Sequence, residues 1–277
     1  MHGGSCRKPC LEPKLRRQDC LDHFGKRPST GGVSFLNTMA KGALRIAATA
    51  DLHYAKHSRG KMHDAFAEIS SSADVLLLCG DLTEYGLPEE AEELAADVRS
   101  AVRIPIIAVI GNHDYESGQP EMVSKVLDEA GVNMLVGEAI EIAGVGFAGI
   151  SGFGGGFGRR MLNAWGEPLI KQFVQESISH AIRLEQALVK LQTERRIVVL
   201  HYSPIRATLQ GEDPEIYAFL GSSRLEEPIN RFRVTAVFHG HAHNGILDGK
   251  TSTGIPVYNV SEPALRKTGK SYRIVEL

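Results

Sequence analysis

Short apolar runs punctuate the chain from residue 44 onward, and several are rich in Val and Ile. Such runs, bounded by Gly, Asp or Asn, are typical of buried strands. Two of them flank Ala143-Gly144, and that spacing predicts a hairpin. The predicted strands cover residues 44–49, 75–79, 104–110, 140–142, 145–150, 197–200, 234–238, 256–260 and 272–275.

Stretches with helical spacing lie between these runs, and they are predicted at residues 60–72, 88–98, 121–130 and 168–194. Pro88 suits the first turn of its helix, where no backbone donor is needed. The longest stretch has an apolar stripe that we expect to face the core; it is formed by Ile170, Phe173, Val174, Ile178, Ile182, Leu184, Leu188 and Leu191. Strands that alternate with helices predict an α/β fold.

Polar residues that can bind metals follow five of the predicted strands. They form the motifs Asp51-Leu52-His53, Gly80-Asp81, Gly111-Asn112-His113-Asp114, His201 and Gly240-His241-Ala242-His243. In open α/β sheets, ligands bind beyond the carboxyl ends of the strands. Five strand ends that carry metal-binding residues can therefore converge on one site. Histidines scattered over the surface would not all follow strands in this way.

A mixed set of ligands of this size can hold two metal ions. Imidazole suits first-row transition metals, and carboxylate and amide oxygens suit harder divalent ions. Asp51 and His53 are two residues apart, so both side chains would point the same way in an extended segment. Gly80 would let the backbone approach the metals, and the two oxygens of Asp81 could bridge the ions. Two ions lower the pKa of bound water and orient a phosphoryl group, which favours hydrolysis at phosphorus.

These motifs, in this order, resemble those of the calcineurin-like metallophosphoesterase superfamily, and the resemblance covers residues 44 to about 260. It implies a four-layer α-β-β-α sandwich of two mixed sheets flanked by helices, with the metal site at the carboxyl ends of the strands. It implies a first ion held by Asp51, His53, Asp81 and His243, and a second held by Asp81, Asn112, His201 and His241. A metal-bridging hydroxide would attack phosphorus, and His113 matches the catalytic histidine. The ions could be Mn, Fe, Zn or Co.

Neighbouring residues have supporting roles in this hypothesis. Asp114 would fix its backbone turn, and Glu84 would orient the imidazole of His113. Arg159 and Arg160 lie in a glycine-rich segment, residues 152–165, that could cover the site and contact phosphate; a solvated loop is the alternative.

Three other histidines, His57, His63 and His180, are expected on the surface or in helices rather than as ligands. His239 is expected either to support the site or to be a buried structural residue. Cys79 is expected in the core.

Within the superfamily, the motifs favour small bacterial phosphoesterases, among them the class III cyclic-nucleotide phosphodiesterases. The residue three after Asp81 is Glu84, where purple acid phosphatases have a tyrosine, and no Asp-Arg-Gly signature follows Gly80-Asp81. We expect a phosphodiesterase that acts on a small nucleotide-like substrate. The alternatives are a phosphomonoesterase of broad specificity and, from another class, a non-catalytic metal-bound scaffold. The filled ligand positions argue against the scaffold.

Composition and net charge indicate where the protein is located and what it binds. The chain has 277 residues, 43% hydrophobic, with net charge −2; residues 1–40 carry seven basic and three acidic side chains, which leaves the remainder at −6. An acidic body gives no reason to expect nucleic-acid or membrane binding.

Residues 1–41 lack hydrophobic periodicity, so we expect a disordered basic extension before a phosphoesterase domain at residues 42–277. Met39 as the true start, or a metal cluster of Cys6, Cys10, Cys20 and His23, are the other interpretations. Few cysteines and no apolar leader predict a cytoplasmic protein.

Overall fold

The computed structural model describes residues 43–277. The predicted basic extension, residues 1–41, and its candidate Cys/His cluster lie outside the described residues. Within the described range, no helix has both the length and the apolar character needed to cross a bilayer.

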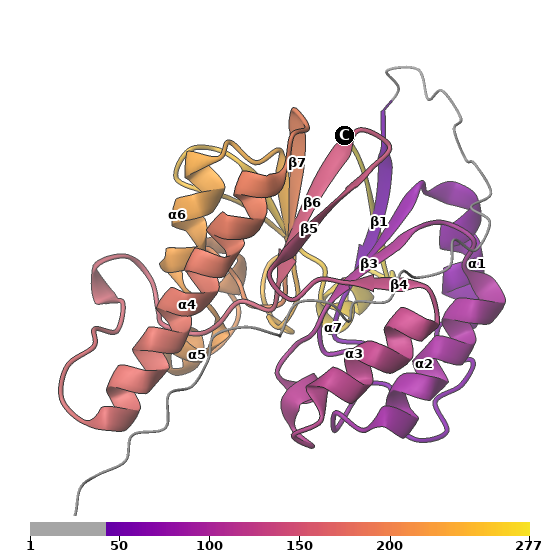
Figure 1. Ribbon diagram of the computed structural model, residues 1–277, viewed down its shortest axis with the longest axis horizontal. Coiled ribbons are helices and arrows are strands. Elements are labelled where there is room, and N and C mark those ends of the chain that lie inside the picture. The colour runs from indigo at the N-terminus through magenta and orange to yellow at the C-terminus, as the bar shows by residue number, and fades with distance from the viewer. Residues whose placement is uncertain (1–42) are drawn as a thin grey trace, which may run out of the picture. The chain divides into compact units, whose positions relative to one another are not determined.

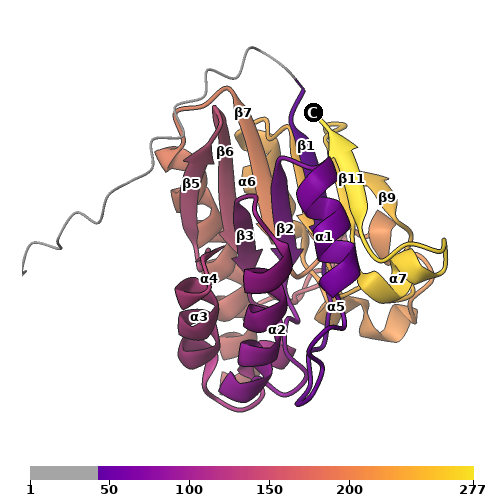
Figure 2. The ribbon, with the colours of Figure 1, turned by 90° about the vertical axis from the view of Figure 1, so that its right-hand side faces the viewer.

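Two sheets stack face to face in this part of the chain (Figures 1 and 2). The first has the order β11-β1-β2-β3-β4 and the second β5-β6-β7-β8-β10-β9. The strands of the first sheet are β1 (Arg45–Thr49), β2 (Val75–Cys79), β3 (Ile106–Val109), β4 (Val132–Met134) and β11 (Arg273–Glu276). Those of the second are β5 (Glu138–Ile142), β6 (Val145–Ile150), β7 (Arg195–Leu200), β8 (Ala236–His239), β9 (Asp248–Lys250) and β10 (Pro256–Asn259).

Helices cover the outer face of each sheet. The first sheet carries α1 (His63–Ser72), α2 (Pro88–Ala101) and α3 (Pro120–Glu129), and the second carries α4 (Pro168–Lys190) and α6 (Ser223–Arg231) (Figures 1 and 2). Two short helices, α5 (Tyr217–Leu220) and α7 (Glu262–Arg266), lie in later connections. Each interface between layers has its own cluster of buried apolar residues, including one between the two sheets. The predicted four-layer α-β-β-α sandwich of mixed sheets is confirmed.

Parallel pairing fixes where the functional motifs lie. Strands β1, β2, β3 and β4 are parallel, and so are β6, β7, β8 and β10. In the described part of the chain, β11, β5 and β9 pair in the antiparallel direction. Because parallel strands end at the same edge of their sheet, the residues that follow β1, β2, β3, β7 and β8 are gathered at one end of the sandwich.

The long helix α4 differs from the prediction. Its C-terminal half packs on the second sheet through Leu184 and Leu188, but Ile170 and Ile182 are 43% and 48% exposed. His180, expected on the surface or in a helix, is helical and buried. The predicted core-facing stripe is therefore wrong at Ile170 and Ile182, although Val174 near the N-terminal end is buried. Ile182 is two residues from the buried Leu184, which places it on a different face of the helix.

The strands β4 and β9 and the helices α5, α6 and α7 were not predicted. Each strand has three residues, too few to show a period, and α6 contains Pro228 and charged residues around Leu225 and Ile229. Only the tertiary contacts of Leu225 and Ile229 reveal its buried face.

A buried polar contact ties the loop after β1 to α2. The Tyr54 hydroxyl donates to Asp97 Oδ2 at 2.6 Å, and the same carboxylate accepts from the Gly60 backbone amide. Burial, with the hydrogen bond to Asp97, raises the pKa of Tyr54 above its ordinary value. This contact holds the loop that carries Asp51 and His53.

We expect Tyr54→Phe to lower the free energy of unfolding by about 1–2 kcal/mol, because the Asp97 carboxylate loses a buried donor. Urea denaturation measures the change. Tyr85→Phe is the matched control, since Tyr85 is 53% exposed. Equal stability of the two variants would show that the contact contributes nothing.

Candidate metal centre

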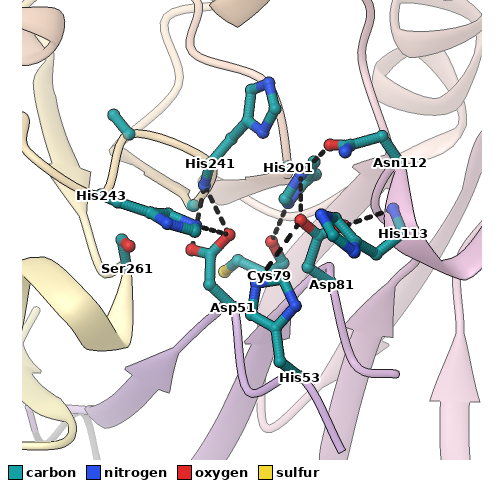
Figure 3. Close-up of polar contacts among 12 residues, drawn as sticks. Asp51, His53, Cys79, Asp81, Asn112, His113, His201, His241, His243 and Ser261 are labelled. Atoms are coloured by element: carbon teal, nitrogen blue, oxygen red, sulfur yellow. Dashed lines mark hydrogen bonds and ion pairs between the residues drawn. The ribbon is translucent and has the colours of Figure 1, made fainter. Parts of the chain in front are cut away.

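Two groups of metal-binding side chains lie side by side at the carboxyl ends of the strands (Figure 3). The first group is Asp51, His53, Asp81 and His243, and the second is Asp81, His201 and His241. Within each group the potential ligand atoms lie within 4.8 Å of one another. Asp81 belongs to both groups, so the two groups share its carboxylate.

Asn112 joins the second group. Its side-chain oxygen lies 2.9 Å from His201 Nε2, which in turn lies 3.4 Å from Asp81 Oδ2. His241 and His243, two residues apart, fall into different groups because the backbone turns at His241. All seven predicted metal ligands are therefore brought together.

The backbone at these positions is not extended. Asp51 and His53 have φ values of 58° and 45°, and Asp81 and His241 have 48° and 69°. The expectation that Asp51 and His53 align along an extended strand end is wrong, and their convergence comes from left-handed turns instead. Such conformations are unfavourable for residues with a side chain and concentrate at functional sites.

Gly111 allows the loops to approach closely. A Cβ atom there would overlap the Asp81 carboxylate and the ring of His201. Only a residue without a side chain leaves space for both ligands.

The donor set fits bound cations. His53 is partly buried, and neither of its ring nitrogens has a hydrogen-bond partner among the described residues. Its Nδ1 lies 3.2 Å from Glu84 Oε2, and its Nε2 lies 4.0 Å from Asp81 Oδ2. Two nearly fully buried carboxylates, Asp51 and Asp81, also need positive charge nearby. A metal ion would satisfy both requirements.

Hydrogen bonds orient the imidazoles of the second group. His201 Nδ1 donates to the Cys79 carbonyl at 3.0 Å, so Nε2 faces Asp81. Burial opposes protonation of His201, but Asp81 and Asp51 overcome it and raise the pKa to about 9. Burial, with the neighbouring His201, lowers the pKa of His241 to about 3, so that ring is neutral and able to ligate.

His113 lies beside the first group. Its ring centroid is 4.5 Å from that of His53, and its backbone amide donates to Asp81 Oδ1 at 2.9 Å. Its Nδ1 donates to the Glu84 carbonyl oxygen at 2.7 Å. A carbonyl only accepts, so this contact keeps a proton on Nδ1 and leaves Nε2 for other partners.

The contacts of Glu84 differ in detail from the prediction. The main-chain carbonyl, rather than the carboxylate, orients His113, and the carboxylate lies beside His53. The reason is local: the strand-like segment at Tyr54 and Thr83 fixes the carbonyl direction, while the side chain extends toward the first group.

Asp114 is fully buried and anchors three loop amides, those of Leu82, Thr83 and Gly111. Burial, with the nearby charge of Asp81, raises its pKa to about 6. It thus holds its own turn against the loop after β2, as the sequence suggested.

The structure does not bring Arg159 and Arg160 to the site. Both are exposed in a short 3-10 helix, η2 (Gly158–Arg160), and neither lines a cavity beside the metal ligands. The aromatic part of the same glycine-rich segment does reach the site, because Phe153 lines both cavities there.

Several residues near the site were missed in the sequence. His180 and Glu176 of α4, Tyr202 after His201, and Phe219 line the same cavities. Tyr202 directly follows a ligand and could have been found from that position. The others come from distant segments and carry no local signal.

His239, for which two interpretations were open, is buried at the carboxyl end of β8 in the second sheet. Its Nε2 lies 2.9 Å from Thr208 Oγ1, and burial lowers its pKa to about 4. These contacts make it a buried structural histidine.

Comparison with known proteins agrees with this geometry. The model of the calcineurin-like phosphoesterase family matches residues 44–245, so the chain belongs to that family. The two groups of ligands could hold the metal ions on which this family generally depends.

A probable cyclic nucleotide phosphodiesterase of Synechococcus sp. is 26% identical over 188 residues, which cover 66% of this chain. The match spans 62% of the length of that relative. Among solved structures, the phosphopantetheinyl hydrolase PptH of Mycobacterium tuberculosis is similar with a TM-score of 0.60 and 17% identity, over 84% of this chain and 96% of that one. The protein TT1561 of Thermus thermophilus has a TM-score of 0.53 and 15% identity, over 85% and 98%. These structures support the fold.

We expect Asp81→Asn to impair both metal positions at once, because one side chain serves both groups. After reconstitution with Mn²⁺, the variant should retain no more than about one ion per chain, measured by mass spectrometry of the metal content. Asp128→Asn, an exposed change on α3, is the control. Two ions at full occupancy in Asp81→Asn would refute the shared position.

Proposed function

We propose that the protein is a metal-dependent phosphodiesterase that acts on a small nucleotide-like ester. The observation that carries the proposal is the convergence of seven metal-binding side chains beside cavities large enough for organic groups of a substrate. The name of the Synechococcus relative supports a diester over a monoester.

One divalent ion would be held by Asp51, His53, Asp81 and His243, and the other by Asp81, Asn112, His201 and His241. When bound, the ions supply activated water and positive charge for the phosphoryl oxygens. The protein residues would hold these ions in place. The Cys79 carbonyl orients the His201 ring, and the Asp114 carboxylate anchors the loops after β2 and β3.

His113 would act on the leaving group. With Nδ1 held by the Glu84 carbonyl, a proton on Nε2 can be donated to the departing ester oxygen or can neutralise charge on the phosphoryl group. Its side chain is partly exposed, as a group that meets substrate must be. The contact between its backbone amide and Asp81 couples its position to that of the ligands.

The reaction class is tested with bis-p-nitrophenyl phosphate and p-nitrophenyl phosphate, each assayed with Mn²⁺ and with chelator. We expect metal-dependent turnover that favours the diester. Preference for the monoester would support a phosphomonoesterase instead. Absence of turnover with two metals bound would support a non-catalytic scaffold.

We expect His113→Ala to reduce turnover of the diester by a factor on the order of 10² to 10⁴, because general acid catalysis is lost. Metal content should stay at the wild-type value, since His113 is not one of the proposed ligands. His63→Ala, an exposed change on α1, should keep wild-type turnover. Unaltered turnover in His113→Ala would exclude the catalytic role.

A further inference from the structure

Two adjoining cavities open beside the metal centre, with volumes of about 230 and 360 Å³. Asn112, Phe153 and Tyr202 line both of them. Asn112 belongs to the second group of ligands, and His241 lines the larger cavity. A molecule whose phosphate lies on the metals would therefore extend into this space. Together the cavities have the size of a small-molecule site.

The walls of the space are aromatic. The ring of Phe153 lies 4.9 Å from that of Phe173 and 5.9 Å from that of Tyr202, measured between centroids. Phe173 in turn lies 5.9 Å from Phe219. Phe219 is 59% exposed and lines the larger cavity, so its ring is open to contact with a ligand there. Walls of this kind favour a planar ring.

One part of the smaller cavity is polar and accepts hydrogen bonds. Glu176 and His180, one turn apart on α4, both line it, and His180 Nε2 donates to Glu176 Oε1 at 3.0 Å. His180 is buried, so it fixes the carboxylate from the protein side. No lysine or arginine forms an ion pair with Glu176 among residues 43–277. Glu176 Oε2 makes no hydrogen bond there and can accept one from a ligand.

We propose that this aromatic space binds the base of a nucleotide whose phosphate ester lies on the metal centre, and that Glu176 selects bases with an amino group. The inference rests on the proposed function for the placement of the phosphate. A carboxylate accepts from the amino group of adenine or cytosine, whereas the carbonyl oxygen at the same position of hypoxanthine or uracil would face it with like charge. His180 acts as a positioning residue for Glu176.

Matched base pairs test the selection through catalysis. We expect the Mn²⁺-loaded enzyme to hydrolyse cyclic adenosine monophosphate with a kcat/KM roughly tenfold above that for cyclic inosine monophosphate. The kcat/KM for cyclic cytidine monophosphate should likewise exceed that for cyclic uridine monophosphate. Glu176→Gln should reduce both ratios toward one, because a carboxamide can donate as well as accept. Ile182→Ala, an exposed change on the same helix outside the cavities, should preserve them. Equal rates for the paired bases in the wild type would overturn the proposal.

Binding separates this inference from the proposed reaction. Isothermal titration calorimetry of the metal-loaded protein with adenosine and inosine monophosphates needs no turnover. Tighter binding of the adenosine nucleotide, lost in Glu176→Gln and weakened in Phe173→Leu, supports the base site even if the diesters are not cleaved. If bis-p-nitrophenyl phosphate is hydrolysed but neither nucleotide binds, the phosphodiesterase stands and the base site is refuted.

Discussion

The site depends on two carboxylates that are held almost out of contact with water. Asp51 and Asp81 are 2% and 1% exposed, and a buried charge without compensation is strongly unfavourable. In the protein alone they are compensated by backbone amides and imidazoles: the His241 amide donates to Asp51, and the His113 amide to Asp81. Even so, neither ring nitrogen of His53 makes a hydrogen bond among the described residues. Divalent cations would complete the compensation of this buried negative charge, so that many metal-binding side chains could lie close together at one edge of the sheets.

The fold strains the backbone at the metal-binding residues as well as positioning their side chains. Four ligands, Asp51, His53, Asp81 and His241, have left-handed backbone conformations, each of which costs on the order of 1 kcal/mol. Hydrogen bonds between the loops after β1 and β2 hold these turns; the Asp51 amide donates to the Gly80 carbonyl, and the His53 amide to the Asp81 carbonyl. The stable parallel sheet beneath them therefore offsets the strain that aims the side chains.

Two sheets contribute to one centre. The first supplies Asp51, His53, Asp81, Asn112 and His113, and the second supplies His201, His241 and His243. The apolar cluster between the sheets, which includes Phe147 and Phe238, sets their separation and thereby the distance between the two groups of ligands. The aromatic space arises differently, where α4 extends past the second sheet and brings Phe173 and Glu176 beside the loops after β6 and β7.

The sequence alone determined the longer strands, the longer helices and the ligand motifs, because each rests on local order: apolar runs end where polar ligands begin, and five such motifs follow one another along the chain. Tertiary structure alone decided the rest. The short strands β4 and β9 form only by pairing with longer neighbours, and the left-handed turns at Asp51 and His53 depend on contacts between loops. Ile182 of α4 is exposed whereas Leu184, two residues later, is buried, because the sheet covers only one face of the helix. Periodicity specifies which face of a helix is apolar, but only packing specifies what that face meets.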